Sequence, residues 1–161
     1  PYVLLGHSLG GVYARLFASE HRRETVGLVL VDSLPPDPTR LLALVPRNLQ
    51  FLVRAELEGR EGLDLEATAR QLRNEAPLGD LPLVVLSASH RGLPSWLSHD
   101  QAVRITRAWR RGHEDLAALS RRGTLVIAEN SGHDIQYDEP ELVLEAIREV
   151  VAMGRRYGRR T

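Results

Sequence analysis

Short runs of apolar residues alternate along the chain with stretches of helical periodicity. Four of these runs have the length of buried strands: residues 2–5, 26–31, 83–86 and 124–128. They are rich in β-branched residues and leucine, which is typical of parallel strands that are covered on both faces. Apolar positions at helical spacing follow the first run at residues 11–21 and the last run at residues 139–153. Repeated strand–helix units of this kind predict an α/β fold with a parallel sheet and flanking helices.

Two segments are longer than a simple crossover between strands requires. Residues 34–80 separate the second and third predicted strands, and we predict that they form a helical lid inserted in the domain. Three parts of this segment have helical spacing: residues 41–45, residues 51–53 and the stretch that begins at residue 63. Residues 92–122 form a second insertion, which the pattern predicts to be one broken helix or two consecutive helices, with Trp109 in the core. All of residues 1–161 are expected to belong to a single domain.

Composition and charge exclude several classes of partner and site. The chain has 21 basic and 21 acidic residues, which removes the electrostatic argument for a nucleic acid or an anionic membrane surface as partner. It has no cysteine, which excludes disulfides, thiol catalysis and thiolate metal sites, and no pair of histidines has the spacing of a metal site. The apolar runs are far shorter than the roughly 20 residues of a membrane-spanning helix. We therefore predict no metal site, no membrane span and no nucleic acid partner.

The sequence GHSLGG at residues 6–11 lies directly between the first predicted strand and the first predicted helix. Gly6 and Gly10 are expected to permit a tight turn, because a side chain at either position would crowd the crossing from strand to helix. A turn of this kind presents its serine to a neighbouring base, which a hydroxyl needs to become a nucleophile near neutral pH. The pattern therefore predicts a nucleophile elbow with Ser8 as the nucleophile. His7, inside the elbow, is predicted to be a substrate-contacting pocket wall or a packing group.

Of the six histidines, His133 is the best candidate for the base that activates Ser8. It follows the fourth predicted strand, and the carboxyl ends of parallel strands meet at the edge on which the elbow also opens. His21 ends the first predicted helix, where a positive charge is favourable for electrostatic reasons alone. Three further histidines lie in or beside the second insertion and are weaker candidates: His90, His99 and His113.

The acid that orients the base is assigned to Asp32, which ends the second predicted strand at the same edge. The alternative is a strand-end aspartate whose side chain caps the following turn. Asp100, inside the second insertion, is the main competitor. The other aspartates are weaker because they lie too close in sequence to the base or at the opposite end of a strand: Asp134, Asp138 and Asp80.

These features together resemble the α/β-hydrolase superfamily: the GHSLGG elbow, the strand that ends at Asp32, the inserted lid and the late loop that carries His133. The resemblance covers nearly the whole chain. It implies a partial α/β-hydrolase fold that corresponds to the C-terminal portion and lacks the N-terminal strands, and the opening at Pro1 leads us to expect a fragment. The strand after the lid runs into residues 87–90 without a carboxylate, which departs from the common pattern and favours Asp32.

The resemblance implies a serine hydrolase that acts on an ester or similar small acyl substrate through an acyl-enzyme and needs no cofactor. It also implies an oxyanion hole of two backbone amides, one of which belongs to Leu9. The other would come from a loop after an early strand, and since loss of one such donor costs about 10²- to 10³-fold in rate, residues 1–161 alone are expected to be a poor catalyst. The same fold hosts lyases, haloperoxidase-like enzymes, receptors and binding modules, which stay open as alternatives.

Overall fold

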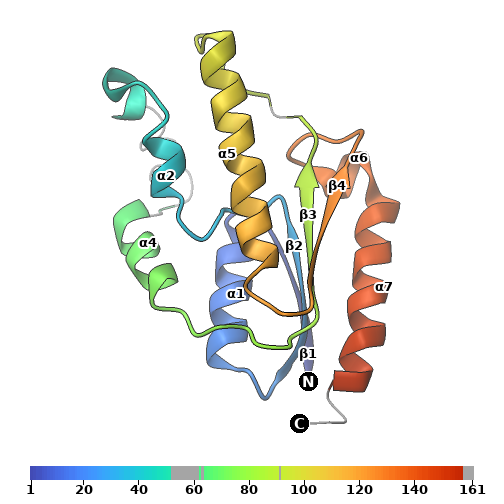
Figure 1. The fold of residues 1–161 in the computed structure, drawn as a ribbon. Helices are drawn as coiled ribbons and strands as arrows, with labels where there is room; N and C mark the ends of the chain where they lie inside the picture. The colour runs from blue at the N-terminus through green and yellow to red at the C-terminus, as the bar shows by residue number, and fades with distance from the viewer. Residues whose placement is uncertain (52–61, 63, 91, 158–161) are drawn as a thin grey trace.

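A four-stranded parallel sheet forms the centre of the molecule (Figure 1). The computed structural model describes residues 1–51, 62, 64–90 and 92–157. The strands follow one another across the sheet in the order of the chain: β1 (Tyr2–His7), β2 (Thr25–Val31), β3 (Leu83–Ala88) and β4 (Gly123–Ala128). Each of the four predicted strands is therefore confirmed, and so is their parallel arrangement.

Helices cover both faces of this sheet, with α1 (Gly10–Glu20) and α5 (His99–Ala117) on one face and α7 (Pro140–Tyr157) on the other (Figure 1). Alternate residues of β2 point to opposite faces, as in any strand. Leu28 and Leu30 belong to the core cluster beneath α1 and α5, whereas Val29 and Val31 belong to the cluster beneath α7. All four side chains are fully buried, so the predicted α/β fold is confirmed by a strand that is covered on both faces.

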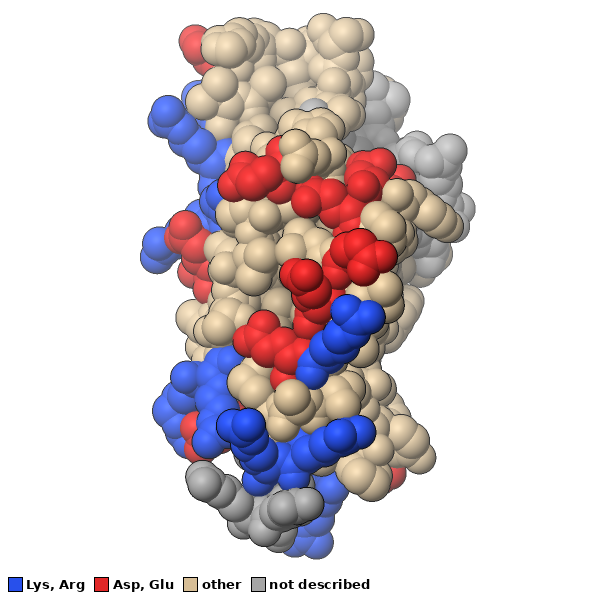
Figure 2. Space-filling view, turned by 90° about the vertical axis from the view of Figure 1, so that its right-hand side faces the viewer, with Lys and Arg blue, Asp and Glu red and all other residues tan. Residues whose placement is uncertain are grey.

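The amphipathic helix predicted at residues 139–153 is α7, which begins at Pro140 and continues to Tyr157. Glu141 lies in its first turn and Arg155 and Arg156 in its last, an arrangement that complements the helix dipole. Figure 2 views this side of the molecule and shows acidic side chains across its middle and basic ones toward its lower end. No helix in the described ranges combines the length and apolar character needed to cross a bilayer.

The predicted lid, residues 34–80, contains three short helical elements within its described part: α2 (Thr39–Leu42), η1 (Arg47–Leu49) and α4 (Leu65–Arg73). Asp64 begins α4 by accepting a hydrogen bond from the Ala67 backbone at 2.8 Å. The first and third predicted helical stretches overlap α2 and α4, whereas residues 52 and 53 of the second lie outside the described residues. Leu42 and Leu72 pack in one buried cluster with Leu9 of the elbow, so this segment covers the region around the turn that carries Ser8.

The second insertion forms one continuous helix, α5, and the prediction of a broken helix or two consecutive helices is wrong. Ser98 and Gln101 form a capping box that starts the helix at its first turn. The helix continues through Gly112. The glycine allows α5 to approach Pro35 closely, because a Cβ at this position would lie 2.5 Å from the Cβ of Pro35. Trp109 is 7% exposed and belongs to the core, as predicted.

A buried ion pair joins α1 to the chain that follows α4. The Nε of Arg15 donates to the Oε2 of Glu75 at 2.9 Å, and the two side chains are 0% and 5% exposed. Burial lowers the pKa of Arg15 and raises the pKa of Glu75, while the attraction between the two charges works against both shifts. The pair thus connects the end of the predicted lid, after α4, to α1, the helix that begins at the elbow.

Replacing Glu75 by alanine is expected to lower the free energy of unfolding by about 3–5 kcal/mol, because it leaves the Arg15 guanidinium buried without its carboxylate. The double variant Arg15→Met/Glu75→Leu removes both charges and is expected to recover most of that loss. Urea denaturation measures both values. Equal losses in the two variants would show that side-chain shape, and not pairing of the charges, decides the stability of this contact.

The same pair predicts a pH dependence. A carboxyl group whose pKa is raised in the folded state binds its proton more tightly there than in the unfolded chain. The part of the stability that comes from the proton on Glu75 is therefore complete below the ordinary glutamate pKa and is lost as the pH rises through the raised value. It is separate from the contribution of the charged pair, which Glu75→Ala removes. We expect the double variant to lack this part of the pH dependence.

Candidate functional site

The turn between β1 and α1 carries Ser8 in a strained backbone conformation. Among the described residues other than glycine, those with a positive φ are Ser8, at 53°, and Asp32, at 38°. Such strain persists only where the surrounding structure holds it, and it is concentrated at functional sites. Gly6 is required in this turn, because a Cβ there would lie 2.5 Å from the carbonyl oxygen of Gly10. Two of the residues predicted to be catalytic thus have the strained geometry that function often uses.

The prediction that Gly10 must be glycine for steric reasons is wrong. A Cβ at Gly10 would meet no atom within 4 Å, because the residue is exposed at the start of α1. The close contact lies one residue further along, where a Cβ at Gly11 would overlap the side chain of Ser33. Ser33 is fully buried, and its hydroxyl donates to the carbonyl oxygen of Ser8 at 3.0 Å. The elbow is therefore hydrogen-bonded directly to the chain that follows Asp32.

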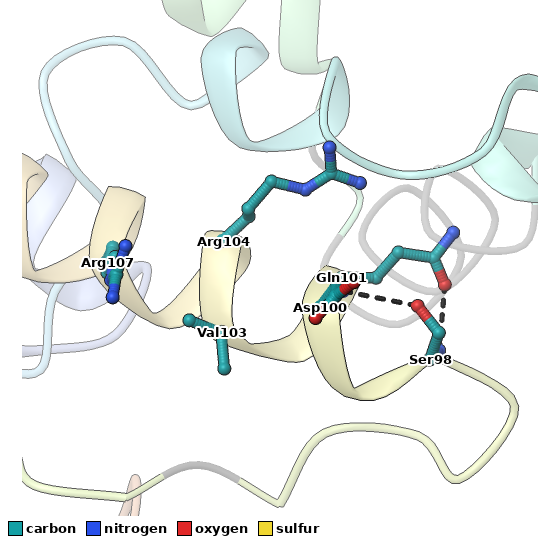
Figure 3. Close-up of a pocket in the computed structure, with 6 residues that line it drawn as sticks. All are labelled: Ser98, Asp100, Gln101, Val103, Arg104 and Arg107. Atoms are coloured by element: carbon teal, nitrogen blue, oxygen red, sulfur yellow. Dashed lines mark hydrogen bonds between the residues drawn. The ribbon is translucent and has the colours of Figure 1, made fainter.

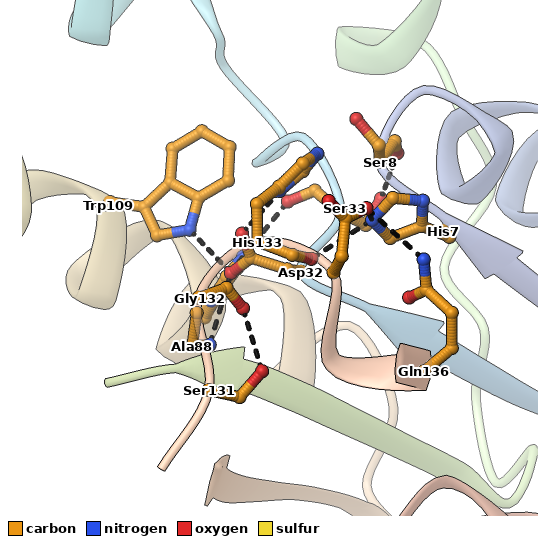
Figure 4. A network of polar contacts seen from close by, with 12 residues as sticks. His7, Ser8, Asp32, Ser33, Ala88, Trp109, Ser131, Gly132, His133 and Gln136 are labelled. Atoms are coloured by element: carbon orange, nitrogen blue, oxygen red, sulfur yellow. Dashed lines mark hydrogen bonds and ion pairs between the residues drawn. The ribbon is translucent and has the colours of Figure 1, made fainter. Parts of the chain in front are cut away.

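Asp32 and His133 meet at the carboxyl edge of the sheet, from the loops that follow β2 and β4. The imidazole Nδ1 donates to Asp32 Oδ2 at 2.7 Å, with the carboxylate 0% and the imidazole 38% exposed. The second oxygen, Oδ1, accepts from Trp109 Nε1 at 2.9 Å and from the backbone N–H of Ala88 at 3.2 Å (Figure 4). A buried carboxylate is costly unless it is hydrogen-bonded, and this one accepts hydrogen bonds at both of its oxygens.

His7 connects the elbow to the loop of His133. Its Nε2 donates to the carbonyl oxygen of His133 at 3.0 Å, and the centroids of the two rings are 4.6 Å apart. Within the part of the chain that the structure describes, no hydrogen bond joins Ser8 Oγ to the imidazole of His133, although Ser8 adjoins His7. Catalytic hydrogen bonds are often long or absent before substrate binds. The contacts of His7 are those of a packing group, and its contact with substrate stays a prediction.

Leu9 precedes the first turn of α1 and is a buried residue, 8% exposed. The first N–H groups of a helix have no acceptor within the helix itself. Among the described residues, the backbone N–H of Leu9 donates to no carbonyl or side chain. A backbone N–H at the start of a helix can bind a negatively charged oxygen, and the role of Leu9 in an oxyanion hole stays a prediction.

The other aspartates considered as the orienting acid lie away from the imidazole of His133 or bond to other groups. Asp100 is exposed in the first turn of α5 and lines a surface hollow of about 540 Å³ (Figure 3). Asp138 accepts from the backbone N–H of Gly132 at 3.0 Å and from the hydroxyl of Ser131 at 3.2 Å, so it fixes the loop that presents His133. Asp134 lies 3.8 Å from the Nε2 of His7, and its side chain is 58% exposed.

Sequence reasoning missed two polar contacts that α5 makes at this site. Trp109 was predicted only as a core residue, yet its indole N–H bonds Asp32, and His113 donates from Nε2 to the carbonyl oxygen of Ser33 at 2.9 Å. The two residues are four positions apart and so lie on one face of the helix. A buried indole N–H needs an acceptor, so placing Trp109 in the core already implies a polar contact for it. The acceptor itself could not be named, because nothing in the sequence gives the path of α5 over the sheet.

Across the described ranges, no three histidine, cysteine, aspartate or glutamate side chains are arranged to hold a metal ion. The imidazoles of His133 and His113 instead bond a carboxylate and a backbone carbonyl oxygen.

Comparison with known sequences identifies the family. The sequence model of the alpha/beta hydrolase family matches residues 1–146. The chain belongs to this family. It is also similar to the uncharacterized protein YqjL of Bacillus subtilis, with 27% identity over 152 residues that cover 93% of this chain and 56% of that protein. This α/β-hydrolase chain thus spans little more than half the length of that relative.

Solved structures give the same fold. The chain superposes on a probable hydrolytic enzyme from Pseudomonas aeruginosa with a TM-score of 0.57 and 18% identity, over 91% of this chain and 62% of the other. For a thermophilic esterase from Thermogutta terrifontis the TM-score is 0.51 and the identity 19%, over 94% of this chain and 65% of the other. At these identities the likeness establishes the α/β-hydrolase fold alone.

Proposed function

We propose that the protein is a serine hydrolase that acts on an ester or similar small acyl substrate. Ser8 is the nucleophile, His133 the general base and Asp32 the acid that orients it. The observation that carries this proposal is the 2.7 Å hydrogen bond between His133 Nδ1 and the buried Oδ2 of Asp32, formed next to the strained turn of Ser8. The family to which the chain belongs supports the same class of reaction.

In the proposed reaction, Ser8 Oγ attacks the acyl carbon while His133 Nε2 takes the hydroxyl proton. The tetrahedral intermediate collapses when the bond to the leaving alcohol breaks and His133 returns the proton to that alcohol. Water, deprotonated by His133, then attacks the acyl-enzyme, releases the carboxylic acid and restores the Ser8 hydroxyl. Asp32 stays ionised and stabilises the imidazolium, and the N–H of Leu9 donates one hydrogen bond to the oxyanion. No cofactor takes part in these steps.

A fluorophosphonate probe tests the nucleophile. Ser8 Oγ is expected to displace fluoride from phosphorus, which leaves a covalent adduct that peptide mass spectrometry assigns to this residue in the full-length protein. Ser8→Ala is expected to abolish the adduct, whereas Ser98→Ala, a change at the exposed cap of α5, is expected to retain it. Turnover of a p-nitrophenyl ester by the same preparation distinguishes an enzyme from a receptor that keeps a reactive serine. A folded protein with no adduct at Ser8 would refute the proposal and favour a binding module.

A further inference from the structure

The two oxygens of the Asp32 carboxylate have different partners. Oδ2 accepts from His133, and Oδ1 accepts from the indole N–H of Trp109 at 2.9 Å and the backbone N–H of Ala88 at 3.2 Å. Both Asp32 and Trp109 are buried, so these bonds form away from solvent. Rotation of the carboxylate would break both bonds to Oδ1 together with the bond to His133. The donors at Oδ1 therefore fix the direction in which Oδ2 points.

The side chain of Trp109, which projects from α5, is fixed by its packing. Its ring packs in the buried cluster that contains Leu9 and Val12, and it meets the imidazole of His113 edge-on with a centroid distance of 5.1 Å. His113 donates to the carbonyl oxygen of Ser33 at 2.9 Å, and its Nε2 lies 3.9 Å from Asp32 Oδ1. One face of α5 thus contacts both the Asp32 carboxylate, through the Trp109 indole (Figure 4), and the backbone of Ser33, through His113.

We infer that Trp109 is a positioning residue for the proposed reaction. Its indole N–H holds Asp32 Oδ1 so that Oδ2 stays directed at Nδ1 of His133. The inference rests on the proposed function, because the direction of Oδ2 affects turnover only where His133 is the base. A residue with a purely packing role could be any aromatic side chain of similar size, whereas a positioning residue at this place needs the N–H donor.

A spectroscopic experiment tests the hydrogen bond without reference to activity. The chain has two tryptophans, Trp109 and the exposed Trp96, so the ¹H–¹⁵N spectrum of the full-length protein is expected to contain their two indole signals beside any from outside this chain. Trp96→Phe and Trp109→Phe assign them. Asp32→Ala is expected to shift the Trp109 indole signal and to accelerate its exchange with solvent, because the acceptor is gone, while the Trp96 signal stays in place. An unchanged Trp109 signal would overturn the inference.

A kinetic experiment tests the positioning role. Trp109→Phe keeps an aromatic ring and removes the donor, and we expect kcat for ester hydrolysis to fall about tenfold with KM nearly unchanged, because the carboxylate loses one of the hydrogen bonds that fix its direction. Trp96→Phe is the matched control and is expected to leave both constants unchanged. Equal kcat values in the two variants, at full folding by circular dichroism, would overturn the positioning role.

The two experiments also distinguish this inference from failure of the proposed function. If wild-type protein neither turns over esters nor reacts with fluorophosphonate, the proposed function fails and the positioning role fails with it, whatever the indole signals show. If wild type is active and Asp32→Ala leaves the Trp109 signal unchanged, the proposed function stands and the inference alone is refuted. Should Trp109→Phe fold poorly, the Asp32→Ala spectrum still decides, because Trp109 is intact in that variant.

Discussion

Replacing His133 by alanine in the full-length protein is expected to reduce kcat for ester hydrolysis by about 10⁶-fold. Loss of the base in a serine hydrolase removes nearly all of the advantage that the nucleophile, base and acid give together, and the residual rate comes from substrate binding and oxyanion stabilisation. The fold is expected to survive, because the imidazole of His133 is 38% exposed and its removal leaves no large cavity. Stopped-time assays with a p-nitrophenyl ester, at enzyme concentrations high enough to detect the residual rate, measure the loss.

His99→Ala is the matched control for this prediction. His99 is exposed at the start of α5, and none of the contacts described for the site involves it, so its removal is expected to change kcat by less than about twofold. A His133→Ala variant that keeps wild-type turnover would exclude His133 as the base. The search would then move to His90, whose loop adjoins that of His133.

The sheet could be predicted from the sequence because each strand is a separate apolar run bounded by polar or turn residues. The run at 26–31 is an example: the alternate side chains of its last four residues enter two different core clusters and are fully buried, so none of these four positions has a solvated face for a charge. Helix continuity was harder to predict. A glycine such as Gly112 is compatible with either a break in the helix or a close approach of the helix to another part of the chain. Here it approaches Pro35, which lies far away in the sequence, so the sequence around Gly112 could not show which of the two applies.

The candidate site could be predicted from the sequence for a related reason. Asp32 and His133 each follow a strand, and parallel strands bring their carboxyl ends to one edge, so their approach follows from topology alone. The role of Gly11 and the contacts of Trp109 depend instead on how helices approach that edge. Sequence periodicity shows which face of a helix is buried, but it does not show which polar atom on the sheet that face meets.

The hydrogen bonds around Asp32 determine how an asparagine side chain would be oriented at this position. Oδ1 is fixed as an acceptor by two donors, Trp109 Nε1 and the Ala88 N–H, neither of which can accept a hydrogen bond. In Asp32→Asn the amide oxygen must therefore occupy the Oδ1 position. The amide nitrogen then takes the place of Oδ2, where it faces Nδ1 of His133 as a donor.

Asp32→Asn is accordingly expected to lower kcat/KM by about 10⁴-fold while leaving the fold intact. Facing a donor, His133 must accept at Nδ1 and carry its proton on Nε2, so it can no longer take the proton of Ser8. The rate of fluorophosphonate labelling at Ser8 is expected to fall in parallel, because it depends on the same proton transfer. Asp100→Asn, a change at an exposed position of α5, is the matched control and is expected to retain wild-type rates. If Asp100→Asn lost activity and Asp32→Asn kept it, the orienting acid would be Asp100, and the hydrogen bond between Asp32 and His133 would serve the fold instead of the reaction.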